Sequence, residues 1–223
     1  MPVRSAIKPK LTVAALRDEA GRFSAVESDF PEPSLYGVTD GKAVGTYFEH
    51  KFQAYLRERY RYQEGSSAKG IDFPGLNVDM KVTSIKQPQS SSPFKNARQK
   101  LFGLGYSVLV FVYAKTDDRR TSTGKLDIRH TIFVEKERTG DYQTTKGLSE
   151  ILRNGGNEED LVAFMMDRNL PIDDIEVAKI AKEILRSPPQ LGYLTISNAL
   201  QWRLQYGHVI RKAGEVNGII RIR

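Results

Sequence analysis

Residues 107–114, SVLVFVYA, form an almost continuous apolar run, and this run constrains the fold more than any other segment. A short run rich in valine is typical of a strand that is buried on both faces. Such a strand lies inside a sheet that is covered by other elements. The segment therefore predicts a central strand of an α/β domain.

The segments around this run alternate between helical and extended patterns. Hydrophobic residues at helical spacing predict a helix over 40–62, and 93–105 is typical of a helix that ends in glycine. Strands are expected at 70–73, at 77–85 and at 129–137. This order predicts a mixed central β-sheet with flanking helices.

The pattern after Gly147 is mainly helical. The last thirty residues predict a helix over 197–206 and two short strands, 208–212 and 218–223, an order that resembles a winged helix. The alternative is a helical cap that packs on the core and contributes to dimerisation. We therefore expect an N-terminal extension (1–40), a core (41–146) and a mainly helical C-terminal region (147–223).

The composition excludes several kinds of protein. No apolar run reaches the roughly 18 residues of a membrane span, and the N-terminus lacks the apolar stretch of a signal peptide, so we expect a cytoplasmic protein without a membrane partner. The absence of cysteine excludes disulfides and thiolate metal sites. The net charge is +7, and basic stretches flank an acidic segment at 141–190, which favours nucleic acid as a partner over a chance excess of surface cations.

Asp72 and Asp79 lie on either side of a Pro-Gly turn. In a hairpin with an even loop they would face each other, with Cβ atoms about 4.5–5.5 Å apart. Two such carboxylates repel unless a cation lies between them or one is protonated. Lys81 follows Asp79 by two residues and so projects from the same face. The three side chains predict a Mg²⁺ site suited to phosphodiester hydrolysis, and the alternative is an exposed hairpin with an Asp–Lys ion pair.

The segment 70–84, GIDFPGLNVDMKVTS, resembles the PD-(D/E)XK nuclease superfamily, and the resemblance covers roughly residues 41–136. It implies that Asp72 and Asp79 bind Mg²⁺ and that Lys81 takes part in catalysis. Many members carry a glutamate on the preceding helix, and Glu49 is the best match; it would hold a second metal or a water, or it is a plain surface acid. Two departures are Ile71, where the family pattern has proline, and the short interval between the two acids.

Among the activities of this superfamily we favour a type II restriction endonuclease. The chain has a suitable size and lacks an ATP-binding GxxxxGK[ST] motif. The family analogy implies a homodimer on double-stranded DNA, because a two-fold protein matches a palindromic site. The alternatives are a repair or junction-cleaving nuclease of the same superfamily and a non-catalytic winged-helix DNA-binding protein.

Candidate DNA contacts are polar or basic residues near the second strand of the hairpin or in the C-terminal region. Amide groups can read base edges, and lysine and arginine can neutralise phosphates. Each of these residues has an ordinary alternative as part of a solvated surface. The candidates are Thr83, Gln87, Gln89, Lys95, Arg98, Asn198, Gln201, Arg203, Arg211 and Lys212.

Overall fold

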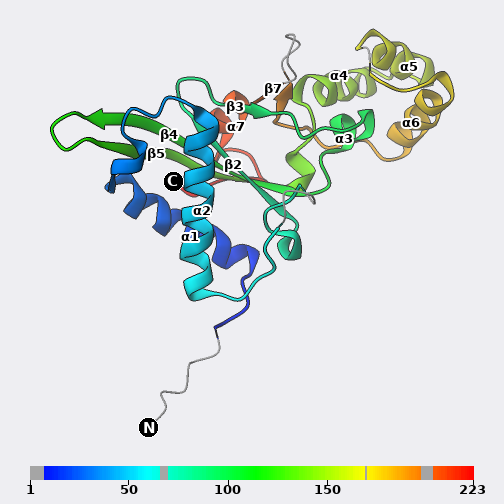
Figure 1. Ribbon diagram of the computed structural model, residues 1–223. Helices are drawn as coiled ribbons and strands as arrows, with labels where there is room; N and C mark the ends of the chain where they lie inside the picture. The colour runs from blue at the N-terminus through cyan, green and yellow to red at the C-terminus, as the bar shows by residue number, and fades with distance from the viewer. Residues whose placement is uncertain (1–7, 66–69, 169, 197–202) are drawn as a thin grey trace. The chain divides into compact units, whose positions relative to one another are not determined.

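The computed structural model describes residues 8–65, 70–168, 170–196 and 203–223 (Figure 1). The chain forms two compact units, each built from segments that are far apart in the sequence. The first unit comprises Met1–Pro88, Val108–Phe133 and Ile220–Arg223, and the second comprises Gln89–Ser107 and Val134–Ile219. The residues of the predicted Mg²⁺ site all belong to the first unit.

The first unit contains a mixed sheet of five strands among the described residues. Its order is β1 (Pro31–Glu32), β5 (Thr123–Val134), β4 (Ser107–Asp118) and β2 (Val78–Ser84), and β8 (Ile219–Arg221) also pairs with β5. The apolar run lies in β4, between β5 and β2, and its residues from 108 to 113 are buried. The prediction of a buried central strand is confirmed.

Two helices, α1 (Val13–Ser28) and α2 (Gly41–Arg59), pack in the same unit, and Figure 1 shows α2 running across the strands. The predicted helix over 40–62 is therefore confirmed as α2. The core joins helix to sheet through aromatic rings, with 4.7 Å between the ring centroids of Phe48 and Phe111 and 5.3 Å between those of Phe52 and Phe111. Asp40 caps α2 by accepting hydrogen bonds from two backbone N–H groups of its first turn.

The hairpin at Pro74-Gly75 has the expected register but lacks its first strand. Phe73 pairs with Val78 in an isolated antiparallel bridge, which places position 72 opposite position 79. The expected strand at 70–73 does not form, since Gly70 has a φ of 67° and the chain enters a short 3₁₀ helix, η2 (Pro74–Leu76), directly after Phe73. Asn77 then turns the chain into β2 with a φ of 56°.

The second unit is mainly helical, as predicted for the segment after Gly147. Its helices are α3 (Ala97–Phe102), α4 (Tyr142–Arg153), α5 (Glu158–Asp167), α6 (Asp174–Arg186) and α7 (Gly207–Lys212). A small antiparallel sheet has the order β3 (Gln89–Ser91), β7 (Arg203–Gln205) and β6 (Thr195–Ile196). Buried side chains of α3 to α6, among them Leu101, Leu148 and Ile180, form one hydrophobic core.

The predicted winged helix is wrong in its strand pair. Residues 208–212 form helix α7 rather than a strand, and the N–H of Ile210 bonds to the carbonyl of Tyr206. The segment 218–223 does contribute a strand, β8, but this strand pairs with β5 and not with a neighbour in sequence. Most of the expected helix over 197–206 lies outside the described residues, and its end, 203–205, is strand β7. Of the described helices, none has the length and apolar character needed to span a membrane.

Candidate active site

Successive side chains of strand β2 point alternately toward the hydrophobic core and toward the candidate site. Val78 and Met80 point into the hydrophobic core. Asp79 and Lys81 project from the other face, where Nζ of Lys81 lies 2.7 Å from Oδ2 of Asp79. The Asp79 side chain is only 3% exposed, whereas that of Lys81 is 26% exposed. A buried carboxylate therefore meets an ammonium group that reaches solvent.

Asp72 is held against β2 by the backbone. Its Oδ2 accepts a hydrogen bond from the N–H of Met80 at 2.8 Å. Its carboxyl group also lies close enough to hydrogen bond with that of Asp79. The structure thus brings Asp72, Asp79 and Lys81 together, as the hairpin register predicted.

The electrostatics of Asp79 favour a bound cation or a bound proton. Burial raises the pKa of Asp79 to about 6; the charge of Lys81 lowers it, and the hydrogen bond and charge of Asp72 raise it. Oδ2 of Asp79 is buried and accepts no hydrogen bond of regular geometry, despite its short distance to Lys81. Two adjacent carboxylates with an unsatisfied oxygen fit a hard divalent cation such as Mg²⁺.

Glu49 lies on α2, and its charge interacts with those of Asp79 and Lys81. The side chain is partly buried, and burial raises its pKa, while the charge of Lys81 lowers it and the charge of Asp79 raises it. Within the described part of the chain, no three histidine or acidic residues are grouped closely enough to hold a metal ion. The charge of Glu49 thus interacts with those of Asp79 and Lys81, but Glu49 does not form a three-ligand set with the two aspartates.

The expected DNA contacts in the first unit differ in exposure. Thr83 is 4% exposed, and its hydroxyl donates to the carbonyl of Gln87 at 3.4 Å. The side chain of Gln87 is exposed beyond the end of β2. Gln87 is therefore accessible to a ligand, whereas Thr83 is placed to stabilise the turn after the strand.

The remaining expected contacts belong to the second unit. Arg98 donates two hydrogen bonds to the Glu183 carboxylate, both at 2.8 Å, and Lys212 pairs with Glu215 at 2.9 Å. These cations are thus partly neutralised by acids of the same unit. Gln89 begins β3, Lys95 is exposed before α3, Arg203 lies in β7 and Arg211 in α7, while Asn198 and Gln201 lie outside the described residues.

The family follows from comparison with known proteins. The family model described as "Type II restriction enzyme NspV" matches residues 10–221, which is nearly the whole chain. The chain belongs to the NspV family of type II restriction enzymes. A curated relative, the type II restriction enzyme NspV of Nostoc sp. (strain ATCC 29411 / PCC 7524), is 64% identical over 212 residues, which cover 95% of this chain and 96% of the relative. No solved structure matches the chain.

Membership of the NspV family confirms the predicted resemblance to a type II restriction endonuclease, and with it the expectation of a DNA nuclease. The match extends beyond the 41–136 segment that carried the resemblance, because it includes nearly all of the second unit. It favours restriction over the repair, junction-cleaving and non-catalytic alternatives.

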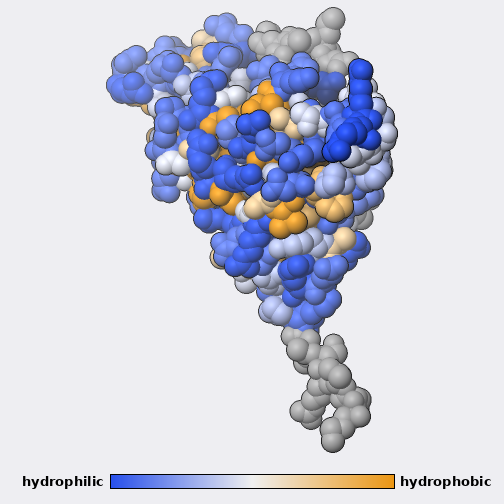
Figure 2. Space-filling view, turned by 90° about the vertical axis from the view of Figure 1, so that its left-hand side faces the viewer, coloured by the Kyte–Doolittle hydropathy of each residue, from blue (hydrophilic) through white to orange (hydrophobic). Residues whose placement is uncertain are grey.

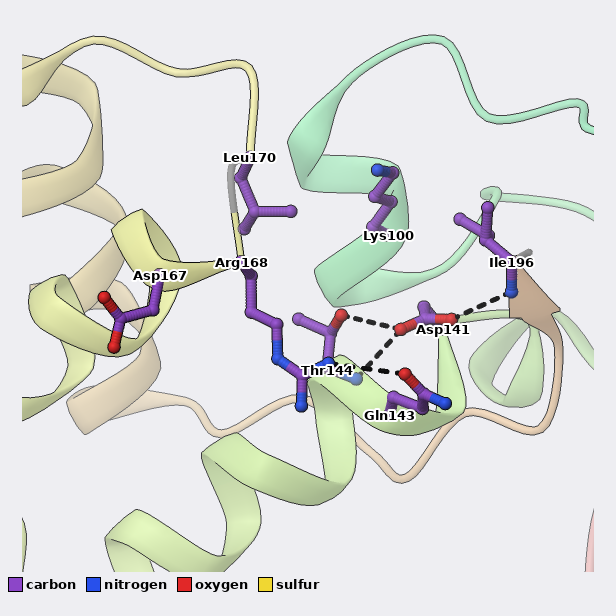
Figure 3. Close-up of a pocket in the computed structure, with 8 residues that line it drawn as sticks. All are labelled: Lys100, Asp141, Gln143, Thr144, Asp167, Arg168, Leu170 and Ile196. Atoms are coloured by element: carbon purple, nitrogen blue, oxygen red, sulfur yellow. Dashed lines mark hydrogen bonds between the residues drawn. The ribbon is translucent and has the colours of Figure 1, made fainter. Parts of the chain in front are cut away.

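One cluster in the second unit was not predicted as a site. Lys100 and Asp141 line a pocket together with residues of α4 and α5 (Figure 3). Neither Lys100 nor Asp141 was predicted from the sequence as a functional residue. Their proximity depends on the packing of α3 against α4, which no local pattern specifies.

Proposed function

We propose that this chain is a Mg²⁺-dependent endonuclease that hydrolyses phosphodiester bonds of double-stranded DNA at a specific sequence. The observation that carries this proposal is the buried carboxylate of Asp79, next to Asp72 and 2.7 Å from the Lys81 ammonium. A structural ion pair would not need a second acid at the same place. The family name supports DNA as the substrate.

Each residue has a role that follows from its position. Asp72 and Asp79 would hold the metal, because their oxygens converge and Oδ2 of Asp79 lacks a regular hydrogen bond. When bound, Mg²⁺ supplies a Lewis acid that polarises the phosphate and lowers the pKa of a water. Lys81, partly exposed, stabilises negative charge that develops on the phosphate or orients the attacking water.

Glu49 is proposed as the fourth member of the site. Its pKa is raised by burial, so it can exchange a proton nearer to neutral pH than an ordinary glutamate. This property suits a group that orients or deprotonates a water, and it agrees with the absence of Glu49 from any described three-ligand set.

We further propose that the enzyme acts as a homodimer. Figure 2 shows hydrophobic side chains gathered on one face among hydrophilic ones. Large apolar residues of the first unit are exposed, including Val26 at 66% and Phe30 at 42%. Such a surface suits burial against a second copy. Sedimentation of the purified protein should give about twice the 25.2 kDa of one chain, and a monomer at micromolar concentration would contradict the homodimer.

The first test is cleavage of a long, varied duplex DNA in Mg²⁺ buffer. The wild type should give discrete fragments, whereas Asp79→Ala and an EDTA control should leave the DNA intact. Asp127→Ala is the matched control, because Asp127 also lies on a strand two residues before a cation, Arg129, with 2.8 Å between them, but is 36% exposed. This variant should cleave normally.

The outcomes separate the parts of the proposal. A smear that Asp79→Ala abolishes would keep the nuclease and contradict sequence specificity. Cleavage by Asp79→Ala at the wild-type rate would overturn the assigned site, and intact DNA with the wild type under all metal conditions would overturn the activity.

A further inference from the structure

Asp72 lies beside the buried carboxylate of Asp79, yet no strand holds its backbone in place. Among the described residues, 70–72 lie outside any strand, and the bridge to β2 begins with Phe73. The Asp72 side chain contacts β2 through the hydrogen bond that its Oδ2 accepts from the N–H of Met80 at 2.8 Å. The position of this carboxylate therefore depends on what fixes the chain from which it projects.

The segment 61–65, which lies just beyond α2, packs directly on the backbone of Asp72. The N–H of Gly65 donates to the carbonyl of Asp72 at 2.8 Å. A Cβ at position 65 would clash with the carbonyl oxygen of Ile71 and would lie 2.9 Å from Cα of Asp72. Both obstacles are backbone atoms, which cannot rotate away as a side chain can. Glycine at this position therefore allows the two stretches of backbone to approach this closely.

Tyr62 joins the same segment to helix α2. Its hydroxyl donates to the carbonyl of Gln53 at 3.1 Å, and Gln53 lies on α2. Its ring packs against that of Phe73, the residue after Asp72, with 5.7 Å between the centroids. Burial raises the pKa of Tyr62 to about 12, so the hydroxyl keeps its proton and remains a donor. One side chain thus contacts both the helix that carries Glu49 and the neighbour of Asp72.

The other end of the segment is fixed by the N-terminal part of the first unit. The N–H of Arg61 donates to the carbonyl of Pro9 at 2.9 Å, and the carbonyl of Arg61 accepts from the N–H of Leu11 at 3.0 Å. Leu11 is 1% exposed and belongs to the hydrophobic core. The segment is therefore held at Arg61 and reaches Asp72 with its last residue.

We propose that the segment 61–65 positions the carboxylate of Asp72 for metal binding, with Gly65 and Tyr62 as positioning residues. Gly65 acts through its backbone, and the hydroxyl of Tyr62 is bonded to α2, so both act through Asp72. The inference rests on the proposed function in one respect, since the metal site at Asp72 and Asp79 belongs to that proposal. Partners that orient the ligands of a metal typically contribute about 10–100-fold to its affinity.

The first readout is hydrogen exchange at the Met80 amide, measured by NMR in EDTA relative to the amides of β4. This N–H donates to the Asp72 carboxylate, so it reports the position of Asp72 without metal and without cleavage. Gly65→Ala should raise the exchange rate of Met80 by about tenfold, which corresponds to the loss of one hydrogen bond to a charged group. Tyr62→Phe should change the rate in the same direction.

Two matched controls separate positioning from general stability. In Gly124→Ala the new Cβ would lie 2.8 Å from the backbone of Leu35, so this variant also creates a backbone clash in the first unit, but next to η1. Tyr60→Phe removes a hydroxyl that donates to Glu19 on α1 at 3.0 Å, and thus makes the same chemical change as Tyr62→Phe. Both controls should leave the exchange of the Met80 amide unchanged.

The second readout is the affinity for Mg²⁺, measured by calorimetric titration without DNA. Gly65→Ala should bind Mg²⁺ about 10–100-fold more weakly than the wild type, and both controls should bind it normally. Tyr62→Phe keeps the ring that packs on Phe73, so it should fold and carries the test if Gly65→Ala does not.

The outcomes distinguish the positioning role from the proposed function. Met80 exchange at the wild-type rate in Gly65→Ala and Tyr62→Phe would overturn the positioning role, as would equal acceleration in the two controls. Faster exchange in these two variants alone, with unchanged affinity for Mg²⁺, would overturn the role in metal binding. Faster exchange in these two variants alone, with a wild type that binds no Mg²⁺, would keep the positioning of Asp72 and overturn the proposed metal site.

Discussion

Asp79 dominates the electrostatics of the candidate site at the scale of single residues. Its folded pKa, about 6, lies above the ordinary value of 3.8, so the folded protein holds this proton more tightly than the unfolded chain. The stabilising contribution of this group is therefore present below about pH 4 and is lost as the pH rises through 6. The difference between the two pKa values corresponds to a contribution of about 3 kcal/mol at most to the free energy of unfolding.

The direction of the pKa shift of Asp79 predicts how the isosteric variant Asp79→Asn behaves without metal. Asp79→Asn in EDTA should be more stable than the wild type at pH 8, and the difference should shrink as the pH falls below 6. Adding Mg²⁺ should raise the Tm of the wild type and leave that of Asp79→Asn almost unchanged. Urea denaturation across this pH range, with and without Mg²⁺, measures both effects. A variant that is less stable than the wild type at pH 8 would contradict the assigned cause of the pKa shift.

Glu49 gives a second prediction at this scale. If Glu49 orients or deprotonates a water, Glu49→Gln should reduce kcat/KM by about 100-fold and flatten the acidic limb of the pH–rate profile. Glu58→Gln is the matched control, because Glu58 lies on the same helix with a side chain that is 74% exposed. Equal rates for the two variants would remove Glu49 from the mechanism.

The residues of the site could be predicted because they depend on one local register. The pairing of Phe73 with Val78 places Asp72 opposite Asp79, and strand periodicity places Lys81 beside Asp79. The burial of Thr83 was not predictable in the same way, since it depends on the turn after β2 and not on the strand itself.

At the scale of elements, the turn before β2 sets the register that places the residues of the site. Asn77 has a φ of 56°, a left-handed conformation that asparagine and glycine tolerate better than other residues. Asn77→Ala should therefore lower the free energy of unfolding by about 1 kcal/mol and reduce cleavage, while Asn77→Gly should retain both. Urea denaturation and cleavage rates test this, and an unaffected Asn77→Ala would show that the turn does not fix the register.

Helices and the buried strand were predictable from periodicity, whereas short strands were not. Residues 208–212 alternate in a way compatible with a strand, yet they form α7 and bury Val209. The strand at 219–221 was expected, but its partner β5 lies about ninety residues earlier in the sequence. Local patterns indicate that a segment is extended; they do not identify the strand with which it pairs.

At the scale of the whole molecule, the last strand belongs to the unit that holds the candidate site. Thr131 donates its N–H to the carbonyl of Arg223 at 3.2 Å, and Ile222 donates to the carbonyl of Thr131 at 2.8 Å. Deleting residues 219–223 removes these bonds together with the buried side chain of Ile219 and the partly buried side chain of Ile220, which packs against the hydrophobic core. The truncated protein should unfold at a markedly lower temperature and lose cleavage through instability. Calorimetry would check this, and an unchanged Tm would contradict the contribution of β8.

The discontinuous units have a practical consequence for exchanging parts between related enzymes. The second unit is encoded by two separate stretches, Gln89–Ser107 and Val134–Ile219, and helix α3 from the first stretch packs on α4 from the second. A chimera that transplants only the longer stretch would join helices from two parents across one core. Any transfer of this unit as a working module must therefore move both stretches together and leave β4 and most of β5 with the recipient.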